Sequence, residues 1–278
     1  MTRSTDSRPI GVFDSGVGGL TVLSEIRRRL PDESTIYLGD NERTPYGPRP
    51  ADEVRRFTLE CVAWLLDQDV KALVLACNTA TSHALGDVRA ASPVPVLGVV
   101  RPGAVTAAAA TRSGHVGVIA TVGTVASGAY PAAINEADRR LAVRQQACPD
   151  LVPLVEAGEL DGPETAAAVN GYLKELLRAD PTIDTLLLGC THYPLLRPLI
   201  ERRVGPEVKV VDSAFSTALA IEDLLDALGA RAPAHDGGDG RDGHRIATTG
   251  DVAAFRAVAE RVFGARLPAA EAVTVAAH

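Results

Sequence analysis

Two cysteines of the chain lie in similar local surroundings. Cys77 and Cys190 each follow a short apolar run, and each precedes residues that form hydrogen bonds, Asn-Thr in one case and Thr-His in the other. Such apolar runs are typical of buried parallel strands, so each thiol is expected at the carboxyl end of a strand, where a helix begins. The N–H groups and the dipole of a helix start lower the pKa of a cysteine from about 8.5.

Two thiols that face each other across one cleft have a specific chemical use. One can remove a proton from a carbon atom while the other delivers a proton to the opposite face, which is the chemistry of a racemase or epimerase. The alternative is that both are small buried hydrophobic side chains. Their matching positions favour the chemical role. We assign Cys61, on the apolar face of a predicted helix, and Cys148, before a proline, to packing.

His192 follows Cys190 by two residues and leaves other chemistries open. A Cys–His pair could serve acyl transfer, as in a cysteine-dependent amidase, although His192 would then need a third group to orient it. A zinc site could be formed by Cys77, Cys190 and His192, but no spacing typical of metal ligands occurs. We therefore expect no metal. In its simplest structural role, His192 caps backbone groups at a helix start.

The glycine-rich segment at residues 14–19 follows the first apolar run. A dinucleotide-binding fingerprint would need glycine where Thr21 stands, although Asp40 could act as its ribose-binding acid. A nicotinamide-dependent oxidoreductase is therefore a weak alternative. Pyridoxal phosphate needs a lysine for its Schiff base. None of the three lysines follows a predicted strand: Lys71, Lys174 and Lys209. We expect a reaction without a cofactor.

The apolar runs alternate with longer amphipathic stretches. They occupy residues 10–13, 35–38, 72–75, 94–97, 115–119, 141–143, 185–188, 208–211 and 245–248. This alternation predicts parallel sheets covered by helices. Residues 71–79 resemble 184–192, and 12–15 resemble 118–121, at offsets of 113 and 106 residues, which indicates a duplication. The expected fold is α/β, with two doubly wound parallel-sheet domains related by a pseudo-twofold axis and an active site in the cleft between them.

The composition excludes several classes of protein. The 278 residues are 46% hydrophobic, so the chain can bury a core and is not disordered. A net charge of -7 without a basic run argues against nucleic-acid binding. No apolar stretch is long enough to span a membrane, and four cysteines suit a reducing cytoplasm. Residues 229–244 are rich in Gly, Asp and Arg and are expected to form a flexible loop.

Four segments together resemble the glutamate racemases of the aspartate/glutamate racemase superfamily. They are residues 10–20, 38–47, 76–81 and 188–194, in matching order and spacing. The resemblance implies an isomerase that interconverts L- and D-glutamate without cofactor and supplies D-glutamate for peptidoglycan. Aspartate or another acidic amino acid stays an alternative substrate. The expected partners are this small-molecule substrate and a second copy of the chain in a homodimer, with no membrane and no nucleic acid.

The resemblance also implies roles for single residues and a division of the chain. The implied catalytic residues are Cys77, Cys190, Asp14 and His192. The implied substrate-binding residues are Asp14, Ser15, Tyr46, Gly47, Asn78, Thr79, Thr121, Thr191 and His192. Two further carboxylates, Asp40 and Glu156, are expected to support the site. The first domain would comprise residues 1–97 plus 208–270, and the second 98–207.

Overall fold

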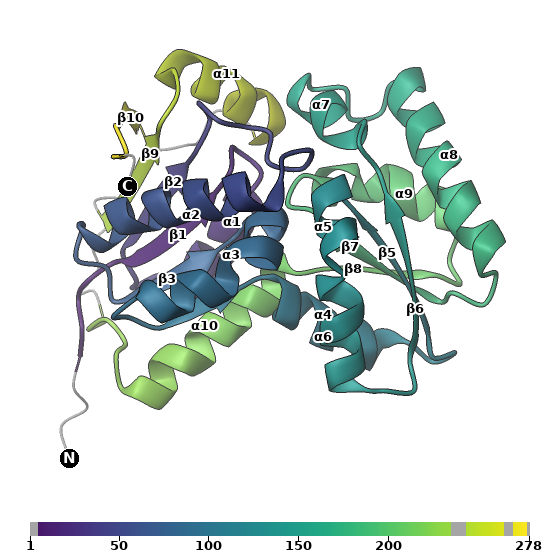
Figure 1. The fold of residues 1–278 in the computed structure, drawn as a ribbon, viewed down its shortest axis with the longest axis horizontal. Helices are drawn as coiled ribbons and strands as arrows, with labels where there is room; N and C mark the ends of the chain where they lie inside the picture. The colour runs from purple at the N-terminus through teal and green to yellow at the C-terminus, as the bar shows by residue number, and fades with distance from the viewer. Residues whose placement is uncertain (1–4, 235–242, 264–268, 277–278) are drawn as a thin grey trace.

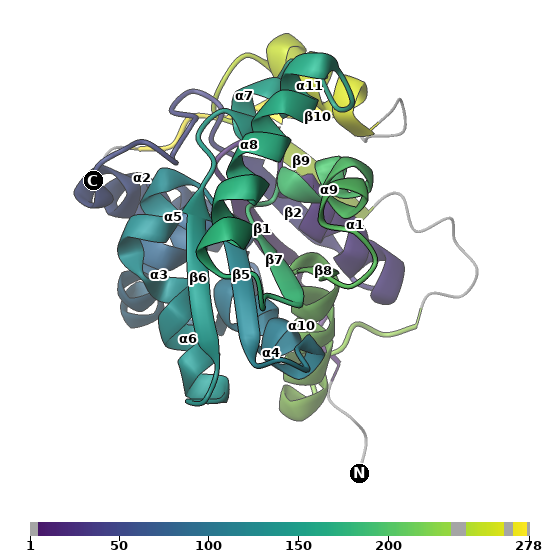
Figure 2. The same cartoon turned by 90° about the vertical axis from the view of Figure 1, so that its right-hand side faces the viewer.

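The computed structural model describes residues 5–234, 243–263 and 269–276. Two α/β units lie side by side, each with a central sheet between helices (Figure 1). Figure 2 shows the sheet of the second unit in front of the sheet of the first. Every strand pair in both sheets is parallel. The predicted fold class is therefore confirmed.

The first sheet has six strands in the order β10-β9-β2-β1-β3-β4. Their bounds are β1 (Ile10–Asp14), β2 (Thr35–Gly39), β3 (Ala72–Leu75), β4 (Val96–Gly98), β9 (His244–Thr248) and β10 (Ala270–Ala272). One face packs against α1 (Leu20–Arg29), α10 (Ala214–Leu228) and α11 (Val252–Phe263). The other face packs against α2 (Ala51–Leu66) and α3 (Asn78–Ala91). Aliphatic side chains dominate both layers because β1, β2 and β3 are buried on both faces.

The second sheet has four strands in the order β6-β5-β7-β8. They are β5 (His115–Ala120), β6 (Ala142–Ala147), β7 (Thr185–Gly189) and β8 (Lys209–Asp212). One face packs against α4 (Val100–Ala110) and α6 (Ala129–Ala137), which α5 (Val122–Ser127) precedes. The other packs against α7 (Leu151–Glu156), α8 (Pro163–Ala179) and α9 (Arg197–Val204), with a short 3₁₀ helix, η1 (Tyr193–Leu196), before α9.

All nine apolar runs overlap a strand, and β10 is an addition. It has only three residues, Ala-Glu-Ala, at the edge of the sheet, and it lacks the β-branched residues typical of strands. The run at 208–211 forms β8, which pairs with β7 of the second sheet. We therefore propose that the second segment extends to Asp212, beyond the expected boundary at residue 207.

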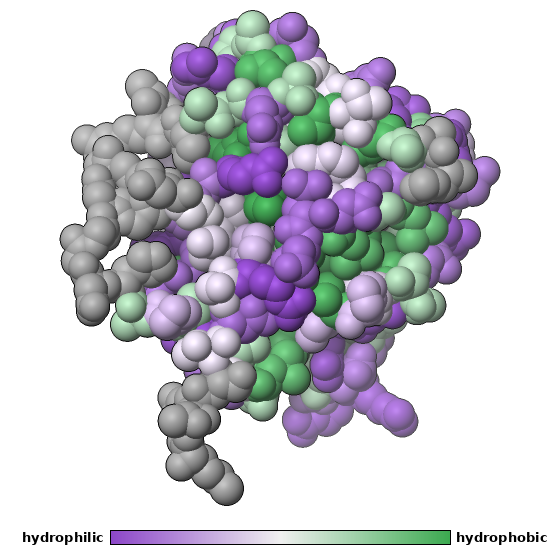
Figure 3. Space-filling model, turned by 90° about the vertical axis from the view of Figure 1, so that its left-hand side faces the viewer, coloured by the Kyte–Doolittle hydropathy of each residue, from purple (hydrophilic) through white to green (hydrophobic). Residues whose placement is uncertain are grey.

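Of the expected loop at 229–244, residues 235–242 lie outside the described residues. Helix α10 ends at Leu228 and is capped by Gly229, whose φ of 63° is the left-handed conformation that favours glycine. Within the described ranges, no helix is both long and apolar enough to cross a membrane. On the face of the first unit that points away from the second, hydrophobic residues form separate clusters among hydrophilic ones (Figure 3).

Candidate active site

One pocket of about 230 Å³ lies between the two units. Its walls come from segments that follow strands of both sheets, as expected for open parallel sheets. Ten of the residues expected at the site line it: Ser15, Tyr46, Gly47, Cys77, Asn78, Thr79, Thr121, Cys190, Thr191 and His192. The structure thus brings the two thiols, which are 113 residues apart in the chain, into one pocket.

Cys77 lies at the start of α3, next to a backbone N–H group and a hydroxyl. Its Sγ accepts a hydrogen bond from the backbone N–H of Ala80 at 3.4 Å, which makes it the N-cap of the helix. Ser15 Oγ lies 3.3 Å from the same sulfur. Burial, with the nearby Asp14 carboxyl, raises the pKa of Cys77 to about 12. The expectation that the helix start would lower this pKa is wrong, because removal from water outweighs the N–H group.

Cys190 lies beside a charged pair. Its Sγ is 3.8 Å from His192 Nδ1, and His192 Nε2 is 3.0 Å from Glu156 Oε1. Burial alone would lower the pKa of His192, but its hydrogen bonds to Cys190 and Glu156 raise this pKa to about 10. The imidazole is therefore protonated at neutral pH, and its positive charge lies next to the Cys190 sulfur.

Asp14 lies behind the pocket wall and does not line it. Its carboxyl is fully buried, and its Oδ2 accepts a hydrogen bond from the N–H of Gly16 at 2.9 Å. Among the described residues, Oδ1 has no partner. Burial raises the pKa of Asp14, although the positive His192 acts against this. A Cβ on Gly19 would lie 2.5 Å from Asp14 Cβ, so glycine is needed where α1 begins beside this carboxyl.

Hydroxyl groups connect the two units at the pocket. Thr79 Oγ1 lies 2.9 Å from Thr121 Oγ1 and 3.2 Å from Thr124 Oγ1. Thr121 is the N-cap of α5, because its Oγ1 accepts from the N–H of Thr124. The N–H of Gly123 in the second unit donates to the carbonyl of Gly47 in the first at 2.8 Å, which adds a backbone hydrogen bond between the two units.

Asn78 offers the pocket a free donor. Its Oδ1 accepts a hydrogen bond from the hydroxyl of Tyr130 at 2.6 Å, and this contact fixes the orientation of the amide. Its Nδ2 is buried and has no partner among the described residues. Unpaired buried donors are costly, so this group is suited to an acceptor on a ligand. Tyr130 comes from α6 of the second unit, and nothing in the local sequence signals this contact.

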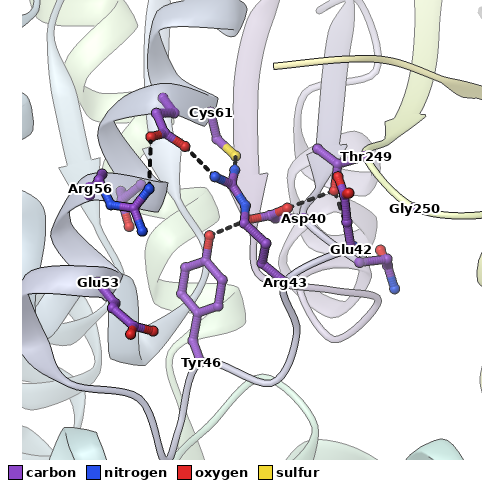
Figure 4. A network of polar contacts seen from close by, with 12 residues as sticks. Asp40, Glu42, Arg43, Tyr46, Glu53, Arg56, Cys61, Thr249 and Gly250 are labelled. Carbon is purple, nitrogen blue, oxygen red and sulfur yellow. Dashed lines mark hydrogen bonds and ion pairs between the residues drawn. The ribbon is translucent and has the colours of Figure 1, made fainter. Parts of the chain in front are cut away.

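Asp40 supports the site from outside the pocket (Figure 4). Its carboxylate accepts hydrogen bonds from the Tyr46 hydroxyl, from Arg43 Nε at 2.7 Å and from Thr249 Oγ1 at 2.6 Å. Arg43 also pairs with Glu60. These contacts hold the segment that carries Tyr46 and Gly47 against α2 and the residues after β9.

The sequence did not single out the other eight residues of the pocket wall, which are apolar apart from Thr44. These residues are Thr44, Pro45, Pro48, Val122, Cys148, Pro149, Val152 and Pro153. They come from loops and short helices whose residue types suggest no chemistry. Cys148 belongs to the core as expected and also lines the pocket. Cys61 belongs to a core cluster and accepts a contact from Arg43 at 3.3 Å. Among the described residues, no three or more His, Cys, Asp or Glu are grouped to hold a metal ion.

The fold agrees with comparison to known proteins. The model of the Asp/Glu/Hydantoin racemase family matches residues 10–221. The chain therefore belongs to this family of racemases.

Several proteins similar to the chain are glutamate racemases. The chain is 47% identical over 253 residues to the glutamate racemase of Shouchella clausii, covering 91% of this chain and 89% of that protein. The crystal structure of glutamate racemase isoform RacE1 from Bacillus anthracis is similar with a TM-score of 0.89 at 44% identity, over 96% and 97% of the two chains. Glutamate racemase from Francisella tularensis, crystallised with D-glutamate, gives 0.88 at 32% identity, over 97% and 98%.

Proposed function

We propose that the chain interconverts L- and D-glutamate without a cofactor, with Cys77 and Cys190 as acid and base on opposite faces of the substrate. The observation that carries this proposal is the presence of both thiols, one from each unit, in the wall of one pocket. The relatives named above favour glutamate over aspartate. A cysteine-dependent amidase would need one thiol and would leave the other without a role.

The reaction can be written as two proton transfers. The negative sulfur of Cys190 takes the α-proton of L-glutamate, and the electron pair of the broken C–H bond stays on carbon as a carbanion. The thiol of Cys77 then donates its proton to the other face, which forms D-glutamate and leaves a thiolate. The reverse reaction exchanges the two roles. Family resemblance assigns Cys190 to the L-isomer and Cys77 to the D-isomer.

The surroundings of each sulfur support this sequence. The protonated His192 lies next to Cys190 and stabilises negative charge there before the first transfer. Cys77, with a pKa of about 12, begins as the thiol. Asp14 lies near Cys77, and a charged carboxylate would repel the thiolate formed in the second step. Its raised pKa favours the neutral acid, which reduces that repulsion.

The polar groups of the pocket suit a substrate with two carboxylates. The free Nδ2 of Asn78, the hydroxyls of Thr79 and Thr121 and the N–H groups at helix starts are neutral donors. No Lys or Arg occurs among the described residues of the pocket wall. We assign the side-chain and α-carboxylates to these donors, and the ammonium group to the side of Ser15, which lines the pocket in front of Asp14. The D-glutamate formed would supply peptidoglycan synthesis.

Circular dichroism of purified protein with L-glutamate tests the proposal directly. After dialysis against a chelator and with no added cofactor, the signal of L-glutamate should decay to zero as the mixture becomes racemic. D-Glutamate should reach the same end point from the opposite sign. Activity that is lost on chelation and restored by a metal ion or by pyridoxal phosphate would contradict the cofactor-free mechanism. Equal turnover of aspartate and glutamate would contradict the assignment of glutamate as the substrate.

A further inference from the structure

Helix α11 belongs to one unit by sequence and packs against both. It connects β9 to β10 of the first sheet. Its Val262 is part of the core of the second unit, and Val258 and Phe263 pack against the cores of both. Figure 1 shows α11 beside α7, across the boundary between the units. The end of α11 is therefore placed to act on the second unit.

Arg261 near the end of α11 contacts the last turn of α7. Its Nη1 donates a hydrogen bond to the backbone carbonyl of Glu156 at 2.8 Å. Carbonyls in the last turn of a helix lack partners within the helix, so a cation there is favourable.

The contact requires glycine at position 158 for two reasons. Its φ is 81°, a conformation that side chains other than glycine rarely adopt. A Cβ at this position would lie 2.3 Å from Arg261 Cδ and 2.7 Å from its Cγ. Any other residue here would displace the arginine side chain from the end of α7.

Glu156 thus connects Arg261 to one of the two thiols. Its backbone carbonyl accepts from Arg261, and its carboxylate holds His192 Nε2 at 3.0 Å, beside Cys190. We propose that Arg261 is a positioning residue that fixes Glu156, and through it His192, for proton transfer at Cys190 but not at Cys77. This inference rests on the two-thiol function proposed above.

The two directions of a racemase constrain how such an effect can be detected. L- and D-glutamate have equal free energies in water, so kcat/KM must stay equal in both directions in any variant. A defect at one thiol therefore appears in the isotope effects. When the Cys190 step slows, C–H cleavage of L-glutamate becomes more rate-limiting, whereas cleavage of D-glutamate at Cys77 becomes less so.

The test compares two substitutions on α11. Arg261→Met keeps the aliphatic stem over Gly158 and removes the guanidinium. Arg256→Met is the control, because Arg256 pairs only with Glu260 within the same helix at 3.2 Å among the contacts described. We expect Arg261→Met to lower kcat/KM about three- to tenfold, the loss for one hydrogen bond. The primary isotope effect on kcat/KM should rise with 2-deuterated L-glutamate and fall with 2-deuterated D-glutamate.

Further variants sharpen the result. Arg261→Lys should restore part of the activity, and Gly158→Ala should reproduce the isotope pattern of Arg261→Met. In a Glu156→Gln background, Arg261→Met should have a smaller additional effect, since the two residues act through one path. Unchanged isotope effects in Arg261→Met, or equal changes for both isomers, would overturn the positioning role. Failure of the unmodified protein to racemise glutamate would instead overturn the proposed function.

Discussion

The two thiols occupy equivalent places in the two sheets but differ in their surroundings. Cys77 lies among Ser15, the N–H of Ala80 and the buried Asp14, all from its own unit. Cys190 lies beside the protonated His192, which pairs with Glu156. The two sheets place the thiols at matching strand ends, and residues that differ between the units put a protonated imidazole beside Cys190. Under the proposed mechanism one sulfur accepts a proton while the other donates one, so the enzyme holds one thiolate and one thiol before each turnover.

Replacing either thiol should give the largest loss of racemisation rate. It should also show which thiol acts on which face of the substrate α-carbon. In heavy water, Cys77→Ser should slow racemisation by roughly 10²–10⁴-fold or more, because serine is a far weaker acid–base group. Cys190 could still exchange the α-proton of L-glutamate, so this isomer alone should gain deuterium with retained configuration. Cys190→Ser should label only D-glutamate. Mass spectrometry after chiral separation measures both, and labelling of the opposite isomer in each variant would reverse the assignment of faces.

Removing the charge beside Cys190 should have the next largest effect. The pKa of His192 is raised to about 10, so its proton is lost as pH rises through that value. The rate should fall over this range, before the thiol of Cys77 deprotonates near its pKa of about 12. His192→Asn should lower kcat by roughly 10²–10³-fold. The fall in rate near pH 10 should be absent from its pH–rate profile.

The control for this prediction is His115→Asn, since His115 pairs with Asp180 at 2.8 Å away from the pocket. A pH–rate profile from weakly acidic to strongly alkaline conditions measures both variants. If the rate of His192→Asn still falls near pH 10, the titration of another group causes that fall.

Binding on the Cys77 side should depend on a hydroxyl from the opposite unit. Tyr130→Phe frees the Asn78 amide to rotate, so its Nδ2 should no longer be directed to a substrate carboxylate. We expect KM to rise about tenfold with a smaller change in kcat, as for one lost hydrogen bond. Tyr172→Phe is the control, because its hydroxyl donates to Asp150 and neither residue lines the pocket. An equal rise of KM in both variants would count against a specific role for Tyr130.

The sequence predicted the positions of the strands well and the pKa values of the site residues poorly. Strand positions follow from apolar runs, and the thiols could be placed because strand ends meet at one edge of a parallel sheet. The pairing of β8 with β7 depends on sheet order, which the linear pattern does not contain. The raised pKa of Cys77 depends on complete burial. The contacts of Tyr130 with Asn78 and of Arg261 with Glu156 join residues 52 and 105 positions apart, so no local motif signals them.

The smallest expected effect concerns the support behind Tyr46, which is independent of both thiols. Thr249→Val removes the hydroxyl that donates to Asp40 at 2.6 Å and accepts from the N–H of Glu42 at 3.2 Å. Arg43 and Tyr46 still contact the carboxylate of Asp40. The free energy of unfolding should fall by about 1–2 kcal/mol, the usual contribution of two hydrogen bonds. Because the other contacts continue to hold the segment, KM should change less than about twofold. Urea unfolding and steady-state kinetics measure these quantities, with Thr106→Val as the control for loss of a hydroxyl that bonds within its own helix. A large rise of KM at unchanged stability would mean that Thr249 positions Tyr46 for binding, and Asp40 would then belong to the substrate-binding machinery.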